Sequence, residues 1–222
     1  MKLAVCLHGH YRTFDKTRGN WESILNSSDV YFHTWDTISS VSASHWKQRN
    51  DIVNKLDTSE INTLNSFNPK VLIIDKQEWT ENDHSIRSQS NMPLKAWIYM
   101  WYGVYVTLNE IKKSGEKYDS ILIGRYDILI NKTLPNIYPQ KGTFITTEHQ
   151  GLVYKQYTDA IIFIDSDDIE ILIEFYHYIN TIEFQIKYIS HNTPEQLFNE
   201  FIQSKNITMT KGWYYSDAPL IR

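Results

Sequence analysis

The chain of 222 residues has a single cysteine, no long apolar run and no excess of basic residues. Cys6 cannot form an internal disulfide, and its place within an apolar run favours a buried thiol in a reducing compartment. The longest apolar stretches, such as 160–164, fall far short of the roughly 20 residues of a membrane helix. Lysine and arginine number 22 against 26 acidic residues, a net charge of −4 that argues against duplex nucleic acid as a partner. We therefore expect a cytoplasmic protein without a membrane span.

Linkers rich in glycine, serine or proline are also missing, so we expect a single domain over 1–222. The apolar run at the N-terminus stops at Leu7 without a small-residue cleavage site, which favours a first strand over a signal peptide. Aromatic residues, in contrast, are abundant, with 7 Trp, 15 Tyr and 9 Phe. Such rings fill cores and also stack on sugars or bases, and composition leaves both uses open.

Short apolar runs alternate with helical patterns along the chain. The runs predict strands at 2–7, 29–35, 70–74, 119–124, 143–147 and 159–164. Apolar residues at three- and four-residue spacing predict helices from Asp15, from Pro93 to Gly115, over 167–178 and from Pro194 to Phe201. This alternation predicts an α/β fold whose mostly parallel sheet is covered on both faces. In such sheets ligands bind outside the carboxyl ends of the strands.

Polar residues follow the first two predicted strands. After the first, Gly9 allows the backbone to pass close to a ligand, Arg12 can pair with a diphosphate, and Tyr11 can stack on a base. After the second, Asp36 can accept hydrogen bonds from ribose hydroxyls. A tight turn with an exposed arginine and an ordinary loop aspartate are the simpler alternatives. The candidate nucleotide contacts here are His8, Gly9, Tyr11, Arg12, Thr13 and Asp36.

The central predicted strand, 119–124, runs directly into Arg125-Tyr126-Asp127. Arg125 and Asp127 are two residues apart, so they share a face if the chain remains extended. A carboxylate at this place can hold a hard divalent cation that bridges phosphate oxygens. The neighbouring guanidinium can neutralise the same phosphates. The alternative is an exposed Arg–Asp pair that contributes little energy.

Six segments, in their order and spacing, resemble a group of GT-A-like glycosyltransferases from bacterial polysaccharide gene clusters and large algal viruses. They read MKLAVCLHGHYRTFDK, DVYFHTWD, MWYG, YDSILIGRYDILIN, TDAIIFIDSDD and TPEQLF. The resemblance implies an α/β/α sandwich with a Rossmann-like nucleotide-binding half at about 1–127 and an acceptor-side half at about 128–222. It also implies a hexosyltransferase that moves a sugar from a nucleotide-sugar, with a UDP-sugar favoured, to a glycan or other hydroxyl acceptor.

The same resemblance implies residue roles. Arg125-Tyr126-Asp127 occupies the place of an Asp-x-Asp metal motif, so Asp127 is expected to hold Mn²⁺ or Mg²⁺ and Arg125 to stabilise the leaving diphosphate. Because the first position is an arginine, either one carboxylate suffices with the diphosphate and waters, or Arg125 replaces part of the metal's charge. Asp159 matches a family aspartate and is the candidate base or sugar-binding carboxylate. Tyr126 and Tyr102 are candidate nucleotide contacts, with core packing as the alternative for Tyr102.

Two other functions remain open from the sequence. A nucleotidyltransferase shares the sheet and the phosphate site, but usually has a glycine-rich basic loop after the first strand, where this chain has only Gly9 and Arg12. A non-catalytic module that binds nucleotides or carbohydrates would keep the fold and use the same aromatic residues.

Overall fold

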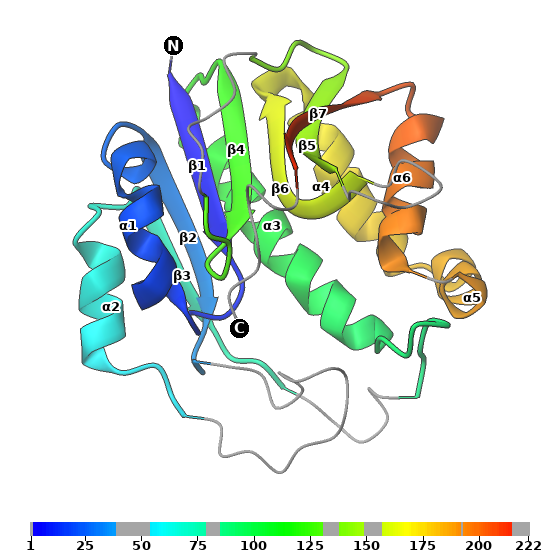
Figure 1. The fold of residues 1–222 in the computed structure, drawn as a ribbon, viewed down its shortest axis with the longest axis horizontal. Coiled ribbons are helices and arrows are strands. Elements are labelled where there is room, and N and C mark those ends of the chain that lie inside the picture. The colour runs from blue at the N-terminus through cyan, green and yellow to red at the C-terminus, as the bar shows by residue number, and fades with distance from the viewer. Residues whose placement is uncertain are drawn as a thin grey trace.

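The computed structural model describes residues 2–38, 54–78, 85–130, 138–148, 157–191 and 193–214. Its centre is a seven-stranded sheet in the order β3-β2-β1-β4-β6-β5-β7 (Figure 1). The strands are β1 (Leu3–His8), β2 (Asp29–Trp35), β3 (Val71–Asp75), β4 (Ser120–Arg125), β5 (Thr143–Glu148), β6 (Tyr157–Asp165) and β7 (Thr208–Tyr214). Strands β1 to β4 are mutually parallel, and so are β5 and β7, whereas β6 is antiparallel to both of its neighbours. The mostly parallel α/β sheet is therefore confirmed, with β6 as its antiparallel element.

Helices cover both faces of the sheet (Figure 1). The core on one face includes residues of α1 and α2, and the core on the other includes residues of α3 to α6. The helices are α1 (Phe14–Leu25), α2 (Thr58–Asn65), α3 (Leu94–Ser114), α4 (Ile169–Ile179), α5 (Ile182–Ser190) and α6 (Pro194–Ser204), with a 3₁₀ turn, η2 (Ser166–Asp168), before α4. Within the described ranges, no helix has both the length and the apolar character that crossing a bilayer requires.

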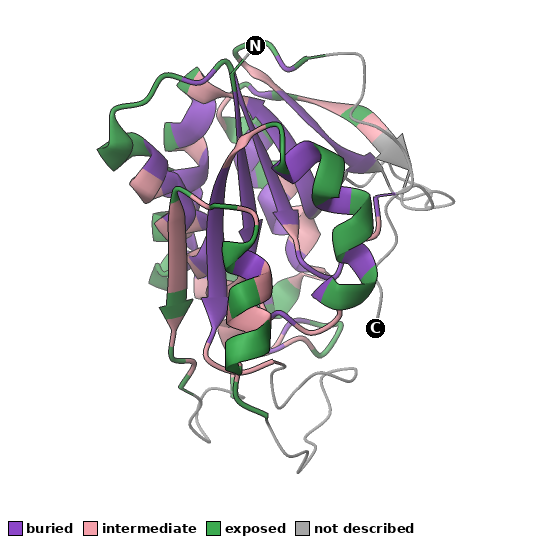
Figure 2. Ribbon diagram, turned by 90° about the vertical axis from the view of Figure 1, so that its left-hand side faces the viewer, coloured by how far each residue is buried: buried purple, intermediate pink, exposed green. Residues whose placement is uncertain are grey.

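The apolar character of β1 follows from its central position. Every residue of β1 is buried, and the central strands are buried along most of their length (Figure 2). Ala4 and Cys6 face the core under α3, while Val5 and Leu7 face the core under α1. A strand covered on both faces has no polar side, which explains the continuous apolar run. Burial raises the pKa of Cys6 to about 12, so its thiol is a core group.

Many of the aromatic residues pack in the core. Trp97 of α3 stacks on Phe184 of α5 with ring centroids 5.5 Å apart, and Trp101 meets Phe175 of α4 at 4.6 Å. These contacts join α3 to the helices that follow β6. Core filling therefore accounts for a large share of the aromatic composition.

Helix boundaries differ from expectation in one informative place. Helix α1 begins at Phe14 after Thr13, one residue before the predicted cap Asp15. Asp15 instead lies in the first turn and accepts a 2.7 Å hydrogen bond from the Tyr11 hydroxyl. The helix after Pro93 runs as predicted and ends at Gly115, whose φ of 67° is the left-handed conformation of a helix stop.

Candidate active site

The carboxyl ends of β1 to β4 meet at one edge of the sheet, because the four strands are parallel. The loop after β1 begins at Gly9, whose φ of 105° suits glycine, and a Cβ placed there would meet no heavy atom of the described residues within 4 Å. Arg12 also has a positive φ, 35°, and its backbone N–H donates to the carbonyl of Ile38 at 2.9 Å. The loops after β1 and β2 are thereby tied together beside open space.

Helix α1 fixes the segment that follows β4. Thr17 donates to the carbonyl of Tyr126 at 2.6 Å, and the Trp21 indole donates to the carbonyl of Ile128 at 2.9 Å. Gly124 leaves room for this indole, since a Cβ there would lie 2.6 Å from the Trp21 ring. These bonds satisfy backbone carbonyls just past the strand end and so determine where Asp127 lies.

Two arginines converge on Asp127. Arg125 donates from Nε to Oδ1 at 2.9 Å and from Nη2 to Oδ2 at 2.7 Å, while Arg12 Nη1 lies 3.5 Å from Oδ2. The Asp127 side chain is only 6% exposed, whereas those of Arg12 and Arg125 are 24% and 25% exposed. Burial alone would raise the pKa of Asp127, but the charges of Arg125 and Arg12 outweigh it and lower the pKa. The pair is therefore a buried, bidentate one, and not the exposed pair considered as the alternative.

Two neutral histidines, His8 and His10, lie beside this cluster. His8 is 1% exposed, pairs in register with Arg125 across β1 and β4, and has no hydrogen-bond partner for either ring nitrogen among the described residues. Burial, followed by the charge of Arg125, lowers the pKa of His8 to about 3. Burial and the charge of Arg12 lower the pKa of His10 equally far, and its Nδ1 contacts the carbonyl of Thr37 at 3.1 Å. None of the positive charge here thus comes from His8 or His10 at neutral pH.

Asp36 and Tyr102 belong to the same edge. Asp36 follows β2, and its Oδ1 is buried without a hydrogen-bond partner in the described part of the chain. Tyr102 of α3 is half-buried and stacks on Trp35 at a centroid distance of 5.7 Å. Burial, with Asp75 second, raises the pKa of Tyr102 to about 12, so its hydroxyl stays protonated.

Asp75 was not singled out from the sequence. It is the last residue of β3, and its Oδ2 lies 3.5 Å from Nε2 of the buried His33, a long contact for a hydrogen bond. Burial lowers the pKa of His33. The rule that led to Asp36, a polar residue at a carboxyl strand end, would have found Asp75 as well.

Two predicted nucleotide contacts are core residues. Tyr11 is 1% exposed and Tyr126 is 0% exposed, and both rings pack against Phe14 at centroid distances of 5.6 and 5.1 Å. Their faces are covered by other rings, so they do not offer a stacking surface for a base. We correct the expectation for Tyr11 and Tyr126 accordingly. Thr13, in contrast, is partly exposed at the start of α1.

Asp159 lies near the same edge through strand pairing. Strand β6 runs antiparallel to β4, with Ile161 opposite Gly124, so the start of β6 meets the carboxyl end of β4. The backbone of Asp159 belongs to this start, while its side chain lies outside what the structure describes. Its expected role as base or sugar-binding carboxylate remains a prediction.

The surroundings of Asp127 do not fit a protein-built metal centre. Both carboxylate oxygens already accept from Arg125, and a cation bound to them would lie next to the positive charges of Arg125 and Arg12. Over the described ranges, no group of three or more His, Cys, Asp or Glu side chains is placed to hold a metal. The arrangement suits an anion better, because two guanidiniums and one carboxylate leave a net positive charge.

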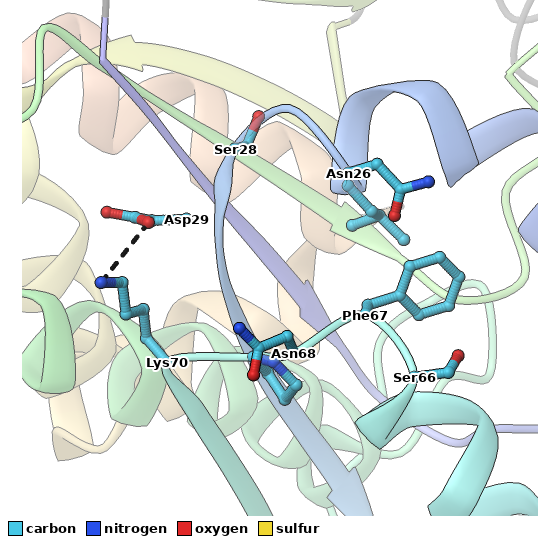
Figure 3. Close-up of a pocket in the computed structure, with 9 residues that line it drawn as sticks. Asn26, Ser28, Asp29, Ser66, Phe67, Asn68 and Lys70 are labelled. Carbon is cyan, nitrogen blue, oxygen red and sulfur yellow. Dashed lines mark ion pairs between the residues drawn. The ribbon is translucent and has the colours of Figure 1, made fainter.

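A cavity of about 550 Å³ lies at the opposite edge of the sheet (Figure 3). Its lining comes from the ends of α1 and α2 and the segments that lead into β2 and β3. Asp29 and Lys70 form a 3.7 Å ion pair there, and Asp29 also accepts from Tyr118 at 2.9 Å. Because ligands of open α/β sheets bind at the carboxyl edge, this cavity is not the candidate site.

Comparison with known proteins supports the fold. The structure is similar to that of a nucleoside-diphosphate-sugar pyrophosphorylase from Vibrio cholerae RC9, with a TM-score of 0.51, 10% identity, and coverage of 98% of this chain and 94% of that one. Looser similarity is found to the apo-form glycosyltransferase GlyE of Streptococcus pneumoniae TIGR4, with a TM-score of 0.47, 8% identity, and coverage of 94% of this chain and 44% of GlyE. A glycosyltransferase involved in glycosylation of the major capsid of PBCV-1 gives a TM-score of 0.41 at 11% identity, over 95% of this chain and 82% of that one.

No family model and no curated protein matches the sequence. At identities near 10% the structural similarity establishes the α/β fold, in agreement with the predicted sandwich.

Proposed function

We propose that this chain is a glycosyltransferase that moves a sugar from a nucleotide-diphosphate-sugar, a UDP-sugar in the first instance, to a hydroxyl of a glycan acceptor. One observation carries the proposal. Arg12 and Arg125 converge on a buried carboxylate at the carboxyl ends of β1 and β4. A diphosphate matches this site in charge, and planar guanidiniums bind phosphate oxygens in bidentate fashion.

The chemistry gives each group a task. Cleavage of the sugar–phosphate bond leaves negative charge on the nucleoside diphosphate, and fixed guanidiniums at that position stabilise the transition state. Asp36 has an oxygen at the end of β2 that no described residue hydrogen-bonds, and it would accept from ribose hydroxyls of the donor. Asp159 would take the proton of the acceptor hydroxyl, which is otherwise a poor nucleophile. Tyr102 would border the nucleotide at the end of β2.

The test is to incubate the protein with UDP-, GDP- and TDP-sugars and to measure the release of the nucleoside diphosphate. We expect slow donor hydrolysis without an acceptor and faster release when a glycan acceptor is supplied. A parallel reaction with nucleoside triphosphates and sugar 1-phosphates detects pyrophosphate. Release of pyrophosphate there, with none of the donors hydrolysed, would make the protein a nucleotidyltransferase. Binding of nucleotides without turnover in either assay would make it a non-catalytic module.

A further inference from the structure

At the position where a metal ion would bind the donor diphosphate, this structure has a bidentate salt bridge between Arg125 and Asp127. Arg125 engages both oxygens of Asp127, and Arg12 approaches Oδ2 from a loop that lies far away in the sequence. The bidentate geometry occupies one lone pair on each oxygen of the carboxylate and sets a guanidinium charge directly beside it, which disfavours a cation at the same group.

The side chains of Arg12, Arg125 and Asp127 differ in how far they are exposed to solvent. The carboxylate side chain of Asp127 is 6% exposed, and each arginine side chain is about four times more exposed at 24% and 25%. A ligand that arrives from solvent therefore meets the arginine side chains before the carboxylate. With charges of +1, +1 and −1, the cluster attracts an anion and repels a cation.

The neighbouring polar groups strengthen this assignment. The ring nitrogens of His8, a residue that is 1% exposed, have no partner among the described residues, and His8 carries no charge near neutral pH. Buried polar groups without partners are costly, so the unpaired nitrogens of His8 in the described part of the chain call for a specific reason at this position. Arg12 also has a positive φ, which costs conformational free energy, while its side chain reaches Asp127.

We infer that Arg12 and Arg125 together replace the metal ion at the donor diphosphate, and that Asp127 is the anchor that holds the two guanidiniums in place rather than a metal ligand. The inference rests on the proposed function and adds how the donor is held. It predicts that nucleoside diphosphates bind without any divalent cation, and that the diphosphate is the part recognised by the arginines.

Isothermal titration calorimetry with UDP and GDP tests this, first in EDTA and then in Mn²⁺. We expect the same dissociation constant in both, and competition by inorganic pyrophosphate in EDTA. Arg12→Gln should weaken binding about tenfold or more in both buffers, because one charge-assisted contact is lost. Lys141→Gln is the matched control, since it removes one positive charge from a 71% exposed side chain near η2. Circular dichroism checks that both variants are folded.

The outcomes separate the two proposals. Binding of UDP or GDP only in Mn²⁺ would overturn the arginine assignment and leave the proposed function standing. Equal affinity of Arg12→Gln and the wild type would remove Arg12 from the site. If neither nucleotide binds in either buffer and no donor sugar is hydrolysed, the proposed function fails as well.

Discussion

At the scale of single residues, the pairing of Arg125 with Asp127 has a direct kinetic consequence. Arg125→Lys retains the charge but loses the planar fork that spans both oxygens of Asp127. We expect donor turnover to fall about 100–1,000-fold, the range seen when one oriented donor is removed from a transition-state site. Arg125→Asp places a second carboxylate near Asp127, so its residual turnover should rise as Mn²⁺ is added.

Donor hydrolysis across a Mn²⁺ titration compares the three proteins. The wild type should give a flat curve, Arg125→Lys a lower flat curve, and Arg125→Asp a rising one. Identical curves for all three would show that Arg125 has no part in the chemistry.

The sequence could predict Arg125 and Asp127 as a pair, because they lie two positions apart at a strand end. It could not predict that Arg12 joins them. That contact depends on β1 and β4 lying side by side and on a left-handed backbone at Arg12, which is uncommon for an arginine. The burial of Tyr11 and Tyr126 was missed for a related reason, since their rings meet across segments distant in the sequence.

At the scale of elements, the close approach of α3 to the sheet depends on Gly103. A Cβ there would lie 2.7 Å from Nδ1 of His33 and 3.0 Å from Cβ of His8. We expect Gly103→Ala to lower the free energy of unfolding by roughly 1–3 kcal/mol through overpacking, despite the better helix propensity of alanine. Urea denaturation measures the change.

Gly19, within α1, supplies the matched control. A Cβ at Gly19 would meet no heavy atom within 4 Å, so Gly19→Ala should raise the free energy of unfolding by about 0.5–1 kcal/mol. A stabilised Gly103→Ala variant would show that α3 can move away from His33 at no cost.

The sequence predicted two kinds of element well. One is the strand buried on both faces, whose residues are almost all apolar, and the other is the helix with clear start and stop residues. Strands β1, β2 and β4 are nearly continuous apolar runs, and α3 lies between Pro93 and Gly115. Helix α5 was missed because Ile182, Ile186 and Ile189 are exposed, which blurs its two-sided pattern. Strand β7 was missed because its sequence, TMTKGWY, has few aliphatic residues and is defined by pairing with β5.

At the scale of the whole molecule, the buried histidines make stability depend on pH. His8 and His10 have pKa values lowered to about 3 in the folded protein, against 6.5 when unperturbed. Between these values the unfolded chain binds protons that the folded chain does not. The free energy of unfolding therefore falls as the pH drops below about 6.5, by on the order of 1 kcal/mol per pH unit for each histidine.

Urea denaturation at several pH values between 7 and 5 measures this slope. The groups that act electrostatically on His8 are Arg125, His33 and Asp127, and the Asp127 carboxylate stays ionised over that range. His8→Asn should give a shallower slope than the wild type. An unchanged slope would mean that His8 takes up its proton without unfolding.

The strand order also sets a sequence of events during synthesis. Both neighbours of β5 in the sheet, β6 and β7, follow it along the chain, whereas β1 to β4 pair among themselves. A ribosome that adds about 5–20 residues per second thus delivers a self-pairing four-stranded group first. Strand β5 leaves the exit tunnel before any partner exists for it and waits for β6, which must enter between β4 and β5. A pause in translation after β5 has emerged, while β6 is still inside the tunnel, would prolong the exposure of this unpaired strand to chaperones and to other nascent chains.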